Sequence, residues 1–230
     1  MLKGKKIIQY FRKIRRLKRI KKYKSKIPPY LKKDFGVELN YKIWTTKGAR
    51  FIASERNKIC DNLSTKTVGY LSAYLIIINL VTIYDIGFLQ QLSTSQLGFT
   101  TTALSILILI YSQFENAKNY SLKSEKFHRC SLEIGQLYNE LRMVKTFENI
   151  DQPETQIRKI SEKYDVILEK YENHSPIDLD SFQLTKPEYF EIKFYKKWWI
   201  KIKRYTNIKL KYHLMIYGPI FLFLWYQFHR

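Results

Sequence analysis

The chain has 230 residues, and its 41 Lys and Arg against 20 Asp and Glu give a formal net charge of +21. Such an excess of positive charge indicates an anionic partner, either nucleic acid or an acidic lipid surface. Two cysteines, Cys60 and Cys130, are too few for a disulfide framework and too far apart for a zinc motif, which excludes a disulfide-rich or zinc-stabilised fold.

Residues 1–33 are a basic N-terminal arm with an amphipathic pattern. Its apolar residues recur at helical spacing between lysines and arginines, at Ile7, Phe11, Ile14 and Leu17. The pattern predicts a helix that lies on an anionic lipid leaflet. A disordered basic arm and an arm that binds nucleic acid are the alternatives, and the neighbouring membrane segments favour lipid.

Residues 67–114 are predicted to form a hairpin of two membrane spans. The apolar run 68–88 contains a single charge, Asp85, and the run 97–114 contains none. Each is close to the ~20 residues that cross a hydrocarbon core of about 30 Å. Because only the short uncharged link 89–96 separates them, a membrane hairpin is favoured over two buried core helices.

The preceding residues 34–66 carry an apolar helical face and are predicted to run straight into the first span. Basic residues before residue 67 far outnumber the acidic ones, and basic residues return after Phe114. The link between the spans has no charge. By the positive-inside rule, both flanks are therefore expected in the cytoplasm and the link outside.

Polar residues fall roughly along one face of each span: Ser72, Asn79 and Thr82 in the first, and Thr101, Ser105 and Ser112 in the second. Polar side chains inside a bilayer need partners or water, so these six residues are candidates to line a pore. Since two helices cannot enclose a channel, such a pore requires a homo-oligomer. The alternative is that the hydroxyls bond to their own helix backbone and that small residues permit close packing.

Residues 115–185 are predicted to form a cytosolic hairpin of two antiparallel helices. Apolar positions in three- and four-residue steps mark a seam on each helix: Phe127, Cys130, Ile134, Leu137, Leu141 and Val144, then Ile157, Ile160, Tyr164, Ile167 and Tyr171. Asp151 is placed as the N-cap of the second helix and Pro153 in its first turn. We interpret the seam as structural packing.

Residues 186–230 are predicted to be a basic and aromatic region associated with the membrane. Its apolar run 212–228 is short and contains Gly218 and Pro219, but it follows KKWWIKIKRY, whose Trp, Lys and Arg suit the headgroup region. The run is able to span the bilayer, re-enter it or lie along its surface, and the sequence leaves these three possibilities open.

The sequence contains no recognisable catalytic constellation, phosphate-binding loop or metal-ligand spacing. We therefore expect no enzyme activity, no catalytic residue and no metal or cofactor. His174 and Asp178 are close enough in sequence for an acid–base pair, but helix capping and docking fit the NHSPID segment better.

A row of residues precedes the first span on the cytoplasmic side. Arg50, Ala53 and Arg56 are spaced three apart, so they are predicted to lie next to one another on a helix. The small Ala53 permits close approach, and the two guanidiniums are expected to bracket a carboxylate. Trp44 is expected to pack against the cytosolic helices. The alternative is that both arginines contact lipid phosphates.

The second motif, Asn173, His174 and Asp178, is predicted to meet this row. Two antiparallel helices of similar length return the chain towards the membrane, where Asp178 would approach the arginines. Such a contact would link cytosolic packing to the helix that enters the bilayer, so we interpret both motifs as docking and gating candidates.

Together the two motifs and the two-span hairpin between them give a pattern that resembles the SLATT family over about residues 38–185. The resemblance implies a two-transmembrane effector of bacterial conflict systems, encoded beside nucleotide-signal synthases, nucleotide sensors or, in one subgroup, reverse transcriptases. It implies no catalytic residue. The basic arm and the region after Lys186 lie outside the resemblance.

The sequence thus predicts an all-α membrane protein with a transmembrane hairpin, a cytosolic helical hairpin and a third membrane segment as a possibility. We expect a multi-pass protein of the bacterial inner membrane, mostly cytoplasmic, that oligomerises and permeabilises the membrane when a cytosolic partner or signal triggers it. Expected partners are anionic headgroups, further copies of the chain, and a neighbouring-gene product such as a reverse transcriptase or nucleotide-signalling enzyme. The alternative is a non-pore adaptor that recruits a nucleic-acid enzyme through its basic surface; direct nucleic-acid binding is left open.

Overall fold

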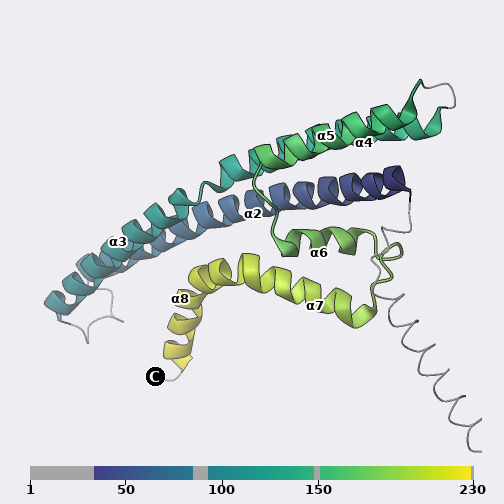
Figure 1. The fold of residues 1–230 in the computed structure, drawn as a ribbon. Helices are drawn as coiled ribbons and strands as arrows, with labels where there is room; N and C mark the ends of the chain where they lie inside the picture. Colours follow the sequence, from purple (N-terminus) through teal and green to yellow (C-terminus); the bar gives the residue numbers. More distant parts are fainter. Residues whose placement is uncertain (1–33, 85–92, 148–150, 229–230) are drawn as a thin grey trace, which may run out of the picture.

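A computed structural model of the chain describes residues 34–84, 93–147 and 151–228 (Figure 1). The basic arm 1–33, the end of the first predicted span with Asp85, and the first half of the predicted link (89–92) lie outside the described residues. Every regular element within them is helical, which confirms the all-α expectation.

The central element is one helix of 49 residues, α2 (Phe35–Ile83). Asp34 caps it, because its Oδ1 accepts a hydrogen bond from the Val37 N–H at 3.0 Å. A helix of this length reaches about 75 Å, enough to extend from a cytosolic domain across a hydrocarbon core of about 30 Å. The predicted continuity of the pre-membrane segment with the first span is therefore confirmed.

Helix α3 (Thr94–Ala117) returns along the second half of α2, and α4 (Tyr120–Thr146) continues along the first half (Figure 1). Asn119, with φ of 50°, turns the chain between them. Among the described residues, two stretches are long and apolar enough to cross a membrane, one in α2 and one within Ser95–Thr146. They correspond to the predicted two-span hairpin.

Helix α5 (Pro153–Lys170) packs on α4, and the two share a buried core with α2. This core consists of Leu39, Ile43, Cys130, Ile134, Leu137, Leu141, Ile160 and Tyr164. The predicted seam is confirmed, but it packs against α2 as well as α5, so the unit predicted to be cytosolic has a three-helix core. The predicted Asp151 cap is wrong: Gln152, in a left-handed conformation, is the N-cap and makes no side-chain capping bond.

Helices α6 (Pro176–Thr185) and α7 (Phe194–Tyr205) lie on the side of α2 opposite α4 and α5 (Figure 1). A π-helical turn, η2 (Thr206–Leu210), joins α7 without a break to α8 (Lys211–Phe228). Their buried side carries Ile200, Ile208, Tyr212 and Ile216. The Tyr74 Oη donates to the Ile216 carbonyl at 2.9 Å, which fixes the start of α8 beside the first span before α8 turns away.

Candidate functional site

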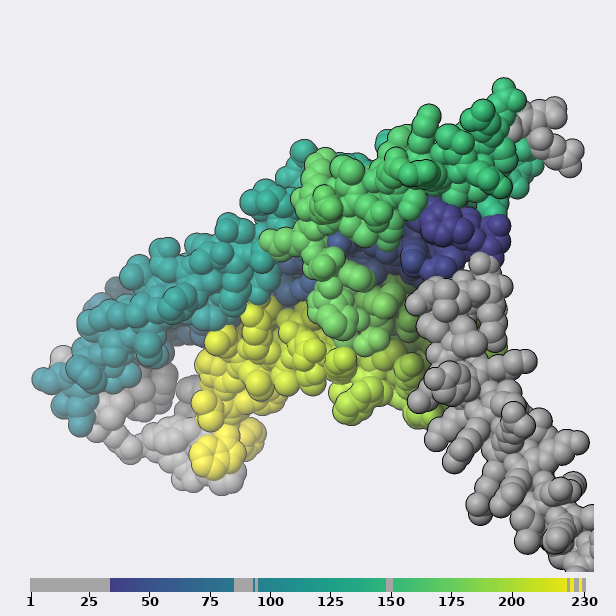
Figure 2. All heavy atoms as spheres, viewed as in Figure 1, coloured from purple at the N-terminus to yellow at the C-terminus, as the bar shows by residue number. Residues whose placement is uncertain are grey.

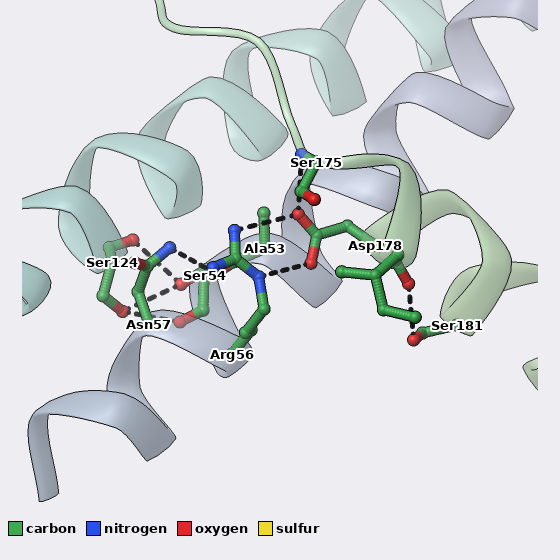
Figure 3. Close-up of polar contacts among 9 residues, drawn as sticks. Ala53, Ser54, Arg56, Asn57, Ser124, Ser175, Asp178 and Ser181 are labelled. Atoms are coloured by element: carbon green, nitrogen blue, oxygen red, sulfur yellow. Dashed lines mark hydrogen bonds and ion pairs between the residues drawn. The ribbon is translucent and has the colours of Figure 1, made fainter. Parts of the chain in front are cut away.

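Arg56 of α2 and Asp178 of α6 form a shielded, two-point ion pair (Figure 3). Arg56 Nε lies 2.7 Å from Asp178 Oδ1, and Nη2 lies 3.0 Å from Oδ2. The Arg56 side chain is 20% exposed and that of Asp178 is 1% exposed. Paired hydrogen bonds between charged groups are stronger and more directional than neutral ones. The contact predicted between these two residues is therefore present.

Asp178 also fixes the start of α6. Its Oδ2 accepts the Ser175 N–H at 2.9 Å, and the Ser175 carbonyl accepts the Asp178 N–H at the same distance. Pro176 occupies the first turn, where a missing N–H costs nothing. A carboxylate here also faces the positive end of the helix dipole. The capping and docking interpretation is thus confirmed, and no hydrogen bond joins His174 to Asp178 within the described structure.

Burial and nearby charges shift the pKa of Arg56 and that of the neighbouring His174. Burial alone would lower the pKa of Arg56, but the hydrogen bond and charge of Asp178 outweigh it and raise that pKa. Burial lowers the pKa of His174, and the Arg50 charge adds to the effect while Asp178 opposes it. His174 is therefore neutral at pH 7, and Arg56 stays charged.

Arg50 does not share the carboxylate, which corrects the expectation that two guanidiniums bracket it. Its Nη2 donates to Asn173 Oδ1 at 3.2 Å, and its guanidinium carbon lies 5.5 Å from the centre of the Phe127 ring. Arg56 follows Arg50 by six positions on α2, so the two side chains leave the helix in directions about 120° apart. Arg50 is only 1% exposed, so it does not contact lipid phosphates in this conformation. Its Nε and Nη1 have no hydrogen-bond partner among the described residues.

Ala53 is fully buried beside a clasp of two serines that sequence reasoning missed (Figure 3). The Ser54 hydroxyl donates to the Ser124 carbonyl at 2.9 Å, and the Ser124 hydroxyl donates to the Ser54 carbonyl at the same distance. These reciprocal bonds hold α2 against the first turns of α4. The available signal was the pair of small residues, which permit close approach of two helices.

Trp44 packs on α6 and on the turn that follows it. Its ring centroid lies 5.2 Å from that of Phe182, 5.0 Å from Tyr189 and 5.8 Å from Phe190. Gly48 makes room for this aromatic cluster, since a Cβ atom there would lie 2.1 Å from a Phe182 ring carbon. Trp44 thus contacts the cytosolic helices, through aromatic residues that sequence reasoning did not single out.

A second polar cluster, also missed from sequence, ties the third apolar segment to the hairpin. Glu115, in the last turn of α3, is 5% exposed and accepts from Tyr212 Oη at 2.8 Å and from Lys211 Nζ at 3.3 Å. Lys118 also pairs with this carboxylate. Only the tertiary fold brings these residues together, because Lys211 and Tyr212 follow Glu115 by almost a hundred positions.

The six pore-lining candidates differ in their surroundings. Thr82, Thr101 and Ser105 donate to carbonyls of their own helices. Thr101 is buried in the hairpin, whereas Ser105 is exposed on its surface. Ser72, Asn79 and Ser112 are half-buried and have no hydrogen bond to another described residue. Within the described part of the chain, no group of three or more His, Cys, Asp or Glu side chains is placed to hold a metal ion.

A helix anchored in a helical bundle and continued into an apolar two-helix hairpin defines a protein of the two-transmembrane class. The chain belongs to the SMODS and SLOG-associating 2TM effector domain family 5, whose model matches residues 32–225. The SLATT resemblance is thereby confirmed, and the match extends beyond residues 38–185 to include most of the region after Lys186. No curated protein and no solved structure matches the chain.

Proposed function

We propose that the chain is an effector of a bacterial antiphage or conflict system that assembles into homo-oligomers and permeabilises the inner membrane. A cytosolic partner or signal triggers it by moving the cytosolic helices. Membership of a two-transmembrane effector family supports the membrane-effector part of this proposal. The product of a neighbouring gene, such as a reverse transcriptase or a nucleotide-signalling enzyme, is the expected source of the trigger.

The observation that carries the proposal is the attachment of α6 to α2 through Arg56 and Asp178. Helix α2 has no break between the cytosolic core residues Leu39 and Ile43 and the first span. A displacement of α6 therefore acts on α2 through a short, shielded ion pair, and an unbroken helix transmits that displacement into the bilayer. This is a physical link between a cytosolic event and the membrane segment, as gating requires.

The polar residues of the spans supply the conducting path. Asn79 and Ser105 are the strongest candidates, because Asn79 has no hydrogen bond to another described residue and Ser105 is exposed on the hairpin surface. Neither is sealed inside the hairpin, so an oligomer is able to turn both towards water. The excess of Lys and Arg favours a leaflet with anionic headgroups and keeps the basic flanks in the cytoplasm.

Ion flux tests this function directly. The full chain is reconstituted into phosphatidylglycerol and phosphatidylethanolamine vesicles loaded with a potassium-sensitive dye, and release is compared with that of empty vesicles. We expect release from the wild type, and its loss in an Asn79→Leu/Ser105→Leu variant that still inserts. Thr100→Leu, which replaces an exposed hydroxyl elsewhere on α3, is the matched control.

The adaptor alternative makes the opposite prediction. An adaptor leaves the vesicles tight at every protein-to-lipid ratio and instead retains a nucleic-acid enzyme at the membrane through its basic surface. The adaptor is supported over the pore by two results together: vesicles that stay tight, and cells whose membrane potential is unchanged when the protein is expressed with its gene neighbours.

A further inference from the structure

We propose that copies of this chain join head to tail, with the exposed face of α7 in one copy docked on the acidic face of α5 in the next. The inference deepens the proposed function, because it rests on the oligomer and names the surfaces that build it. The donor surface, called here the α7 face, consists of Phe194, Tyr195, Trp198, Trp199 and Ile202, with Lys196 and Lys201.

The α7 face is apolar, aromatic and positively charged, and the structure leaves it uncovered. Its five apolar residues are between 50% and 75% exposed. Ile200, on the other side of the helix, is 2% exposed, so α7 is already docked through its buried face. No acidic residue occurs in Phe194–Tyr205. Clustered exposed aromatic residues at this density mark an interaction site, and Trp and Tyr are typical anchors of protein interfaces.

The complementary surface lies on α5 and just beyond it. Asp165, Glu169 and Glu172, called here the acidic row, are exposed and form no ion pair with any described residue. Three neighbouring unpaired carboxylates are unexpected in a chain with twice as many cations as anions. Val166 stands beside them with 63% exposure and borders an open groove of about 580 Å³ between α4 and α5. The groove offers apolar surface at Leu137, Val166 and Ile167 between the charged side chains of Glu133, Glu140, Lys159, Glu162 and Lys163. The acidic row beside it has the charge that complements the basic and aromatic α7 face.

The two surfaces are placed for a head-to-tail contact. They lie on opposite sides of α2, with α5 above it and α7 below it in Figures 1 and 2. Tyr164 of α5 bonds Thr46 of α2 at 2.8 Å, whereas α7 is attached through α6, where Asp180 pairs with Lys203. A contact between two different surfaces of the same chain does not saturate in a dimer, and it generates a ring when the rotation closes.

A lipid surface fits the α7 face less well than a second copy does. The cluster around Glu115, Lys118 and Lys211 marks the cytoplasmic end of the spans. Trp198 lies 13 residues before Lys211 along a continuous helical stretch, which is about 20 Å at the helical rise. One headgroup layer is only about 5–8 Å thick. An α7 that stands upright on the membrane therefore holds Trp198 beyond the headgroups, and the vesicle-binding measurement below tests the case in which α7 lies flat on the lipid.

Charge reversal on each surface tests the interface in the full chain. The α7 variant is Lys196→Glu/Lys201→Glu, and the row variant is Asp165→Lys/Glu169→Lys; all four positions are exposed. The mass of each purified protein in detergent is measured by native mass spectrometry. We expect a wild type larger than a dimer, and each variant shifted to the monomer. Lys58→Glu, an exposed position on α2 that belongs to neither surface, should assemble as the wild type does.

Two further samples separate an interface from a folding defect. The quadruple variant, with both reversals in one chain, should regain the wild-type mass because the charges again oppose each other. A mixture of the two double variants should assemble beyond a dimer by alternation, because the α7 face of each variant has the charge opposite to that of the other variant's row. Neither double variant should assemble alone, and growth beyond a dimer is specific to a head-to-tail contact.

Other results overturn the inference. A monomeric wild type, or double variants with the wild-type mass, would rule out this interface. An α7 variant that assembles normally but no longer binds phosphatidylglycerol vesicles would assign the α7 face to lipid. Flux assays on the same samples keep the two proposals separate: an assembled wild type without flux contradicts the function alone, whereas flux from double variants that keep the wild-type mass contradicts the interface alone.

Discussion

Arg56 on α2 and Asp178 at the start of α6 are separated by 122 positions and share two hydrogen bonds, at 2.7 and 3.0 Å. Asp178 is buried by this contact and also receives the Ser175 N–H, so one carboxylate closes α6 and fastens it to the helix that enters the membrane. A change at the cytosolic helices therefore reaches α2 at this point, which is the premise of the gating proposal.

Gly48→Ala is expected to destabilise the cytosolic unit by about 1–3 kcal/mol, as overpacking of a core does. Alanine in mid-helix would otherwise gain about 0.5–1 kcal/mol over glycine. The clash of its Cβ with the Phe182 ring outweighs this gain. Gly135→Ala on α4 is the control, because only the flexible Lys47 side chain approaches that position, and it should stabilise. Thermal unfolding measures both; an unchanged or higher melting temperature for Gly48→Ala would refute the packing argument.

Arg50→Met is expected to raise the stability of the cytosolic unit by about 1 kcal/mol or more while reducing flux. Arg50 is buried with one hydrogen bond and no carboxylate partner among the described residues, and burial of an incompletely paired charge is costly. A residue that costs stability yet supports activity indicates a functional role. Chemical denaturation and flux are measured on the same preparations. Lower stability of the variant would show that the contacts with Asn173 and Phe127 are net stabilising.

His174 is expected to make the cytosolic unit less stable as the pH falls. Its pKa in the folded protein lies below the ordinary value of 6.5, through burial and the Arg50 charge. The unfolded chain therefore binds the proton more readily, and stability is lost as the pH falls through about 6.5 towards the folded pKa. Melting temperatures at pH 7.5 and 5.5 should differ less for His174→Gln than for the wild type. Equal pH dependence in the two proteins would exclude this role.

A cysteine at Ser95 is expected to react with a membrane-impermeant maleimide in intact cells, because Ser95 is exposed in the first turn of α3, the end that the positive-inside rule places outside. Thr155→Cys on α5 is the cytosolic counterpart and should react only after lysis. Native Cys60 and Cys130 are both buried, so their failure to react says nothing about orientation. Labelling of Thr155→Cys in intact cells would reverse the topology.

Much of the fold follows from patterns that the sequence displays. The length of the apolar runs predicted the hairpin, and the steps from Phe127 to Leu141 predicted the seam of α4. The contact of Arg56 with Asp178 was also predicted, because two antiparallel helices of similar length bring the chain back to the end of the bundle from which it started. These features depend on helix periodicity and chain length, which are local properties.

The rest of the site depends on rotation and on partners from distant elements. The rotation of α2 about its axis decides which arginine meets Asp178. Residues at three-residue spacing do not stay on one side of a helix, because their direction changes by about 120° over six residues. Cross-helix contacts such as Glu115 with Tyr212, and Phe182 over Gly48, have no local signature. The cap at Gln152 was missed because it has a left-handed backbone and no side-chain capping bond, so it lacks the side-chain signature that N-cap prediction uses.

The measurement that tests the central claim most directly is a double-mutant cycle on potassium flux, with Arg56→Ala and Asp178→Asn in reconstituted vesicles. The asparagine keeps an oxygen for the Ser175 N–H, so it removes the charge without removing the cap. We expect both single variants to change the flux several-fold in the same direction and the double variant to match either one. Their coupling free energy for unfolding should be about 1.5–3 kcal/mol. Flux changes that multiply in the double variant, or no change in any of the three, would contradict control of the membrane segment through this ion pair.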